Sequence, residues 1–110
     1  MIEDRLKKLE EQIGANGNVP EASRAELLHL LAELRSEIAE LPSAHADDVR
    51  SIAAFAVASA HEATRLSPKP KLLKAALTGL TGSVEEFETS HPDLAATLNR
   101  LSVVLSNMGM

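Results

Sequence analysis

The sequence predicts an all-α protein, a small antiparallel bundle of about five helices. Hydrophobic residues make up 45% of the 110 residues but aromatic residues only 2%, so the core must be built from Leu, Ile, Val and Ala, which suits close-packed helices better than strands. Leu and Ile recur at spacings of three and four, the period of a helix with one apolar face. We expect residues 1–110 to form a single domain, in which short connections make consecutive helices antiparallel neighbours.

The first two helices are predicted over residues 2–13 and 21–41. The first carries an apolar stripe flanked by charged residues, and the sequence Asn16-Gly17 is a strong turn signal that ends it. The second has a longer stripe of the same kind. The stripe residues are Ile2, Leu6, Leu9 and Ile13 in the first helix, and Leu27, Leu31, Leu34, Ile38 and Leu41 in the second.

A third helix is predicted over residues 46–66, after a break at Pro42. Its middle, residues 52–58, is apolar on every face, and such a helix is normally covered on several sides. It therefore takes either a central place in the bundle or a subunit interface. We favour the interface, with Ile52, Phe55, Ala56 and Val57 as its candidate residues. The alternative is that the alanines are helix-forming residues with little need for burial.

The fourth helix is predicted over residues 70–88, with Pro70 in its first turn. Its stripe consists of Leu73, Ala76, Leu80, Val84 and Phe87. Two glycines interrupt it, Gly79 and Gly82. Residues 78–83 therefore form either a flat face that another helix approaches closely or a break, since Ser83 and Glu86 have capping-box spacing. We favour one continuous helix because the stripe stays in phase.

The fifth helix is predicted over residues 92–107. Pro92 suits the first turn of a helix, and Ser90 is a good N-cap that Asp93 supports. An apolar stripe follows, and Asn107 and Gly109 are the expected stop signal. The stripe residues are Leu94, Leu98, Leu101, Leu105 and Met108.

Composition excludes several classes of function. The chain has no cysteine, so disulfides and thiolate metal sites are absent. Its net charge is −5. Basic residues form no stripe and stacking aromatics are nearly lacking, which argues against nucleic-acid binding. The first residues do not resemble a signal peptide and no stretch suits a membrane span. We expect a cytoplasmic protein that binds neither membrane nor nucleic acid.

Metal binding is the sharpest chemical hypothesis. Glu26-x-x-His29 and Glu88-x-x-His91 have the spacing used in di-iron bundles, where two further glutamates complete the site. Glu62 is a candidate for one of them, and Glu10 or Glu40 for the other. Against this, Glu26 and His29 lie off the apolar stripe, and Glu88 and His91 straddle a helix terminus. We therefore predict no metal or cofactor.

Other chemistry finds less support. His45 and His61, with Asp47, Asp48 and Glu62, form a weaker zinc hypothesis, but both histidines are expected on the surface. No Gly-x-Ser-x-Gly elbow and no phosphate-binding loop is present. We expect no enzymatic activity.

The C-terminal stretch carries a family resemblance. Residues 87–110, FETSHPDLAATLNRLSVVLSNMGM, resemble the signature of an uncharacterised bacterial family, domain of unknown function 4404. Residues 1–41 are similar to its N-terminal part, whereas residues 42–68 look like an elaboration. The resemblance implies no catalytic residue, ligand or partner.

The sequence therefore predicts a non-enzymatic helical protein that self-associates and acts as an interaction or structural module. The alternative is a metal- or small-ligand-binding helical bundle that uses the Glu-x-x-His pairs.

Overall fold

The computed structural model of this chain describes residues 2–109, apart from the side chains of residues 2 and 3. The predicted all-α bundle of five helices is confirmed, since no strand occurs within residues 2–109. Two short 3-10 turns, η1 (Ser43–His45) and η2 (Glu85–Phe87), precede α3 and follow α4. The helices are α1 (Ile2–Ala15), α2 (Glu21–Ala39), α3 (Ala46–Ala63), α4 (Pro70–Val84) and α5 (Pro92–Gly109).

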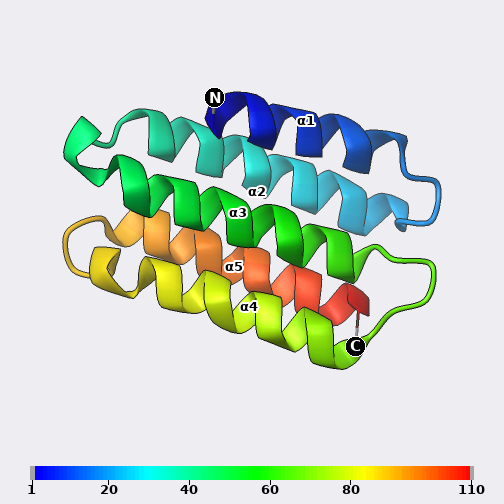
Figure 1. Cartoon of the computed structure of the whole chain (residues 1–110). Coiled ribbons are helices and arrows are strands. Elements are labelled where there is room, and N and C mark those ends of the chain that lie inside the picture. Colours follow the sequence, from blue (N-terminus) through cyan, green and yellow to red (C-terminus); the bar gives the residue numbers. More distant parts are fainter. Residues whose placement is uncertain (1, 110) are drawn as a thin grey trace.

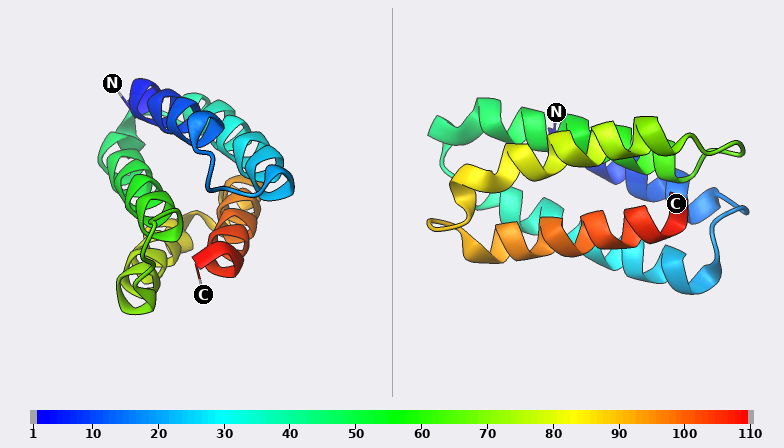
Figure 2. Two further views of the ribbon diagram at one scale, coloured as in Figure 1. Left: turned by 90° about the vertical axis from the view of Figure 1, so that its right-hand side faces the viewer. Right: turned by 90° about the horizontal axis from the view of Figure 1, so that it is seen from below.

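The helices form a ring when the bundle is viewed along its length (Figure 2). The order around the ring is α1, α2, α5, α4, α3, and α3 also contacts α5 across the middle. Helices that follow one another in the chain run in opposite directions (Figure 1). The expectation that all consecutive helices pack as neighbours is wrong for α2 and α3, because α1 packs against both of them.

One continuous hydrophobic core holds all five helices together. The predicted stripes supply most of it, because a spacing of three and four places these side chains on the inner face of each helix. Ile2, predicted to open the first stripe, has a side chain outside the described part of the structure. The stripe residues that the structure buries are Leu6, Leu9, Ile13, Leu27, Leu31, Leu34, Ile38, Leu73, Leu80, Val84, Phe87, Leu94, Leu98, Leu101 and Leu105.

Helix α2 ends earlier than residue 41. The amides of Glu40 and Leu41 bond to carbonyls three residues back, at 3.2 and 3.1 Å, so the last turn tightens into a 3-10 form. Pro42 follows directly, and the residue before a proline is disfavoured in the helical conformation. The apolar stripe alone therefore placed this end two residues too late.

Helix α3 ends at Ala63 rather than at residue 66. The Thr64 hydroxyl donates to the Ala60 carbonyl at 2.8 Å, and Leu66, predicted to lie in the helix, is 84% exposed beyond its end. Because Leu66 does not pack against the core, no tertiary contact stabilises a further helical turn that would include it.

Helix α4 runs unbroken through both glycines, as favoured from the sequence. A Cβ atom added at Gly79 would overlap the ring of Phe55 from α3, whereas one added at Gly82 would meet nothing within 4 Å. The close-approach interpretation therefore holds at Gly79 only. The Ser83 hydroxyl donates to the Leu80 carbonyl at 2.7 Å, so Ser83 caps no new helix. The α-helix ends at residue 84, short of the predicted residue 88.

Helix α5 continues to Gly109, which is therefore not its stop signal. No glycine within the described residues has a positive φ. A Cβ at Gly109 would overlap the Leu73 side chain and lie 3.3 Å from the Ala63 Cα. The glycine thus allows the end of α5 to approach α3 and α4 closely. At the other end, His91 rather than Ser90 precedes the first helical residue.

Arg24 fixes the connection between α1 and α2. Its Nη2 donates to the carbonyls of Asn16 and Val19, at 2.8 and 2.9 Å. Asn16 Oδ1 accepts from the Asn18 amide at 2.9 Å, and Val19 is buried. A charged donor on α2 therefore satisfies carbonyls that no helix uses, and it holds α1 against the bundle.

Candidate interaction surface on the third helix

Helix α3 lies between α1 and α4 on the face shown in Figure 1. Ile52 and Ala56 have 0% exposed surface, so they belong to the core of their own chain and cannot contact a second copy. The prediction of these two as interface residues is therefore wrong, because α1, α4 and α5 cover that side of α3. Phe55 is 37% exposed and Val57 is partly buried, so both remain at the surface.

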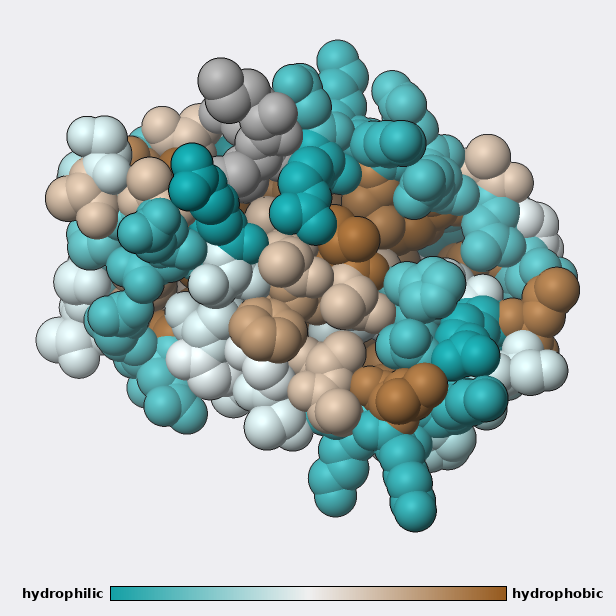
Figure 3. Space-filling model, in the orientation of Figure 1, coloured by the Kyte–Doolittle hydropathy of each residue, from teal (hydrophilic) through white to brown (hydrophobic). Residues whose placement is uncertain are grey.

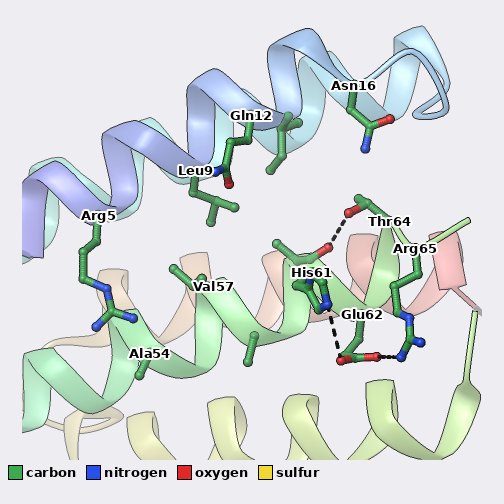
Figure 4. A pocket seen from close by; sticks show the side chains of 13 residues that line it. Arg5, Leu9, Gln12, Asn16, Ala54, Val57, His61, Glu62, Thr64 and Arg65 are labelled. Atoms are coloured by element: carbon green, nitrogen blue, oxygen red, sulfur yellow. Dashed lines mark hydrogen bonds and ion pairs between the residues drawn. The ribbon is translucent and has the colours of Figure 1, made fainter.

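A groove of about 620 Å³ separates α1 from α3. Leu9 and Ile13 of α1 and Ala54, Val57 and Ala58 of α3 line it. Figure 3 shows the resulting brown surface in a hollow below α1, bordered by teal hydrophilic side chains. The close-up in Figure 4 shows Leu9 and Val57 pointing toward one another across the groove. The volume lies within the range of ligand and peptide sites.

Polar side chains border this groove. Arg65 Nη1 lies 2.8 Å from Glu62 Oε1, and His61 Nε2 lies 4.0 Å from Glu62 Oε2. Arg5 lies beside the other end (Figure 4). The groove thus combines an apolar floor with charged edges, the arrangement found at protein–protein contacts.

Three rings pack together at the opposite end of α3. The centroids of His45 and Phe87 lie 5.1 Å apart, those of Phe87 and His91 5.6 Å, and those of the two histidines 5.9 Å. All three pairs meet edge to face, the favoured geometry for aromatic rings. Ser90 Oγ lies 3.0 Å from His91 Nδ1. The Phe-x-x-x-His sequence of the C-terminal signature therefore closes one end of the bundle.

Two carboxylates meet beside these rings. A hydrogen bond with Asp48 and the charge of Asp48 raise the pKa of Glu86 above its ordinary value, with His45 acting in the opposite direction. His45 Nδ1 lies 3.6 Å from Asp48 Oδ2. Glu86 is exposed, so water screens this contact, and we assign it no function.

The residues of the metal hypothesis lie apart. His29 Nε2 is paired with Glu33 Oε1 at 2.8 Å, and Glu62 is paired with Arg65. The structure contains, over the part of the chain it describes, no group of three or more His, Cys, Asp or Glu side chains placed to hold a metal ion. The predicted candidates that it does not bring together are Glu26, His29, Glu62, Glu88 and His91, with Glu10 and Glu40.

The weaker zinc hypothesis fails for the same reason. His45 precedes α3 and His61 lies near its C-terminal end, so roughly 24 Å of helix separates them at 1.5 Å per residue. His45 pairs with Asp48, and Asp47 is exposed beside Arg50.

A smaller cavity, of about 230 Å³, lies between the end of α2 and the start of α5. Glu37, Glu40 and Asp93 line it, together with His91. Burial raises the pKa of Glu37 above its ordinary value; a hydrogen bond with Thr97 acts against this, and nearby acidic groups add to it. The folded chain therefore disfavours the charged form of the Glu37 carboxyl group.

Residues 2–109 form a five-helix bundle with an open apolar groove along α3. No helix in this range is both long and apolar enough to cross a membrane. The chain belongs to the family described as Domain of unknown function (DUF4404), whose model matches residues 2–110. The matched range includes residues 42–68, expected above to be an elaboration. No curated protein and no solved structure matches the chain.

Sequence reasoning missed the α1 side of the surface. It predicted Leu9 and Ile13 only as stripe residues and assigned no role to Arg5 or Arg65. The available signal was the spacing of Ala54, Ala58 and His61, which places them on one outer face of α3. That spacing indicates the face but not the helix that lies beside it.

Proposed function

We propose that this protein is a non-enzymatic, cytoplasmic interaction module that self-associates through the outer face of α3. The observation that carries the proposal is the groove between α1 and α3, with an apolar floor left open along half of a helix. When another chain covers apolar surface of this kind and removes it from water, the free energy of the assembly falls. The absence of enzymatic activity and the cytoplasmic location remain proposals from the sequence pattern.

Phe55 extends this surface toward α4. Its ring lies over Gly79 and is 37% exposed. Exposed aromatic side chains of this kind are enriched at contacts between proteins, where they supply a large area at little entropic cost. The groove on one side and Phe55 on the other give α3 apolar surface on both flanks.

Solution mass tests the proposal. Light scattering over a concentration series should show a dimer or larger assembly that dissociates on dilution. Ala54→Glu places a charge on the exposed face of α3 and should dissociate the assembly with helicity unchanged. Ala56, a natural target from the sequence, is unsuitable because it is buried and a charge there would unfold the chain.

Ala32→Glu is the matched control. Ala32 is exposed near the middle of α2, a helix that does not border the groove, so this variant should keep the wild-type mass. A wild-type protein that has the mass of one chain at every concentration would contradict self-association. An assembly that Ala54→Glu leaves intact would place the contact elsewhere.

A further inference from the structure

Six residues recur at spacings of four and three, five of them on the outer face of α3 and the sixth, Arg65, two residues beyond its end at Ala63. Within the helix this spacing places side chains in one row along a single face. Five of the six are exposed and the last is partly buried. In chain order they are Asp47, Ser51, Ala54, Ala58, His61 and Arg65.

These residues are symmetric in chemistry about position 56. Ala54 and Ala58 lie two residues on either side, Ser51 and His61 five, and Asp47 and Arg65 nine. The centre is small, the intermediate positions are polar, and the two ends carry opposite charges. A surface that matches itself on reversal is what a two-fold contact between identical chains requires.

Building on the self-association proposed above, we propose that the partner is a second copy whose α3 packs antiparallel against this α3, about a two-fold axis close to position 56. The antiparallel arrangement brings Asp47 of each copy to Arg65 of the other. A parallel arrangement would instead bring like charges together at both ends, which is unfavourable. The charges thus select the direction of pairing.

Both charged ends are available for this contact. The Asp47 side chain is 96% exposed, with only a 3.4 Å contact to Arg50. Arg65 is held by Glu62 at 2.8 Å, which uses one Nη atom and leaves the other guanidinium nitrogens as donors. Arg65 can therefore contact Glu62 and the Asp47 of a second copy together.

The flanks of α3 fit the same arrangement. Phe55 and Val57 lie one residue on either side of position 56, so each meets its own counterpart near the axis. Figure 4 shows Arg5 of α1 near Ala54 and Asn16 near Thr64, so α1 borders only the second half of α3. The two-fold axis places α1 of the second copy beside the first half of α3 of the first copy.

The size of the face is sufficient for such a contact. A standard interface removes roughly 800 Å² from each partner, and α3 is about 27 Å long at 1.5 Å per residue. A helix with its side chains is about 10 Å wide, so α3 alone supplies roughly a third of that area. The bundle measures 38 × 25 Å across its two longest directions, so α1 and α4 must take part beside α3.

Two charge reversals, studied alone and mixed, test this register. In Asp47→Arg or Arg65→Glu homodimers, both end contacts join like charges. In a mixture of the two variants, both contacts join opposite charges. Sedimentation velocity should give mixed dimers with a Kd at least about tenfold lower than that of either variant alone. Each substitution also changes a contact within its own chain, with Arg50 or with Glu62. These changes are present both in the separate variants and in their mixture, so they cancel when the two Kd values are compared.

Cysteine cross-linking supplies an independent readout, because the chain contains no cysteine. A mixture of Ala54→Cys and Ala58→Cys should form the mixed disulfide faster than either variant cross-links to itself. Circular dichroism confirms that each variant is folded.

The outcomes separate the two proposals. A wild-type chain that never associates contradicts both. A dimer in which the mixed variants show no preference for each other, and in which the mixed disulfide is not favoured, overturns the antiparallel register but leaves self-association in place.

Discussion

The two glycines of α4 allow a test of how α3 and α4 pack. Gly79 lies beneath the ring of Phe55, whereas Gly82 faces open space. Both adopt the helical conformation without a positive φ, so alanine is compatible with the backbone at each position. Gly79→Ala and Gly82→Ala therefore make the same change to one helix and differ only in what the added methyl group meets.

The expected magnitudes follow from this difference. Alanine is favoured over glycine in a helix interior by about 1 kcal/mol, so Gly82→Ala should raise the free energy of unfolding by that amount and Tm by about 4 °C. In Gly79→Ala the ring of Phe55 must swing outward. Phe55 is 37% exposed, so about 125 Å² of a side chain of about 200 Å² is buried, and exposing half of that buried area costs about 1.6 kcal/mol. Gly79→Ala should therefore be destabilising, by about 0.5 kcal/mol.

Urea denaturation followed by circular dichroism measures both values, at a concentration where light scattering gives the mass of one chain. In a Phe55→Ala background the ring is absent, so Gly79→Ala should regain the full helix-forming benefit. The coupling free energy between positions 55 and 79 should be about 1.5 kcal/mol. Equal stabilisation by the two alanine variants would refute the packing of Phe55 on Gly79.

Three further variants address other contacts. Gly109→Ala should destabilise the chain by about 1–2 kcal/mol in urea denaturation, because its methyl group meets the backbone of Ala63. Arg24→Met should lower stability by about 1–2 kcal/mol, with faster amide hydrogen exchange in residues 14–20 as the specific readout. For Glu37, whose pKa is raised, the folded chain binds a proton more tightly than the unfolded chain. Its contribution to stability should therefore fall as pH rises from about 4.5 through the raised pKa. Glu37→Gln should remove that decline and leave the chain more stable than wild type at pH 7.

Two of these variants have matched controls. Arg35→Met removes an ion pair with Glu10 at 3.2 Å but no contact with the segment between α1 and α2. It should therefore leave amide hydrogen exchange in residues 14–20 unchanged. Gly14→Ala adds a methyl group that meets nothing within 4 Å, so it should not destabilise the chain as Gly109→Ala does. A pH profile that is the same for wild type and Glu37→Gln would contradict the raised pKa.

The apolar stripes were predictable because burial and helix period act on the same residues. Leu27, Leu31 and Leu34 need only a common inner face, and any packing of amphipathic helices gives them one. Helix ends were less predictable. They depend on single contacts, such as the Thr64 hydroxyl on the Ala60 carbonyl, which compete with the stripe over one or two residues.

The candidate surface was partly predictable. The apolar middle of α3 indicated a covered helix, but the sequence could not show which of its faces the chain itself covers. Ile52 and Ala56 face the core, whereas Phe55 and Val57 remain at the surface. Neighbouring residues on a helix point in directions about 100° apart, so the position of α1 and α4 decides their roles.

By itself, the sequence determined the helical class of this protein and most of the residues of its core, and it favoured one continuous α4. These follow from local period and from the burial of Leu, Ile, Val and Ala. The tertiary structure alone decided the order of helices around the ring, the packing of Phe55 on Gly79 and of Gly109 near Ala63, and the open groove beside α3. Each of these depends on contacts between segments far apart in the chain, whose relative positions no local pattern encodes.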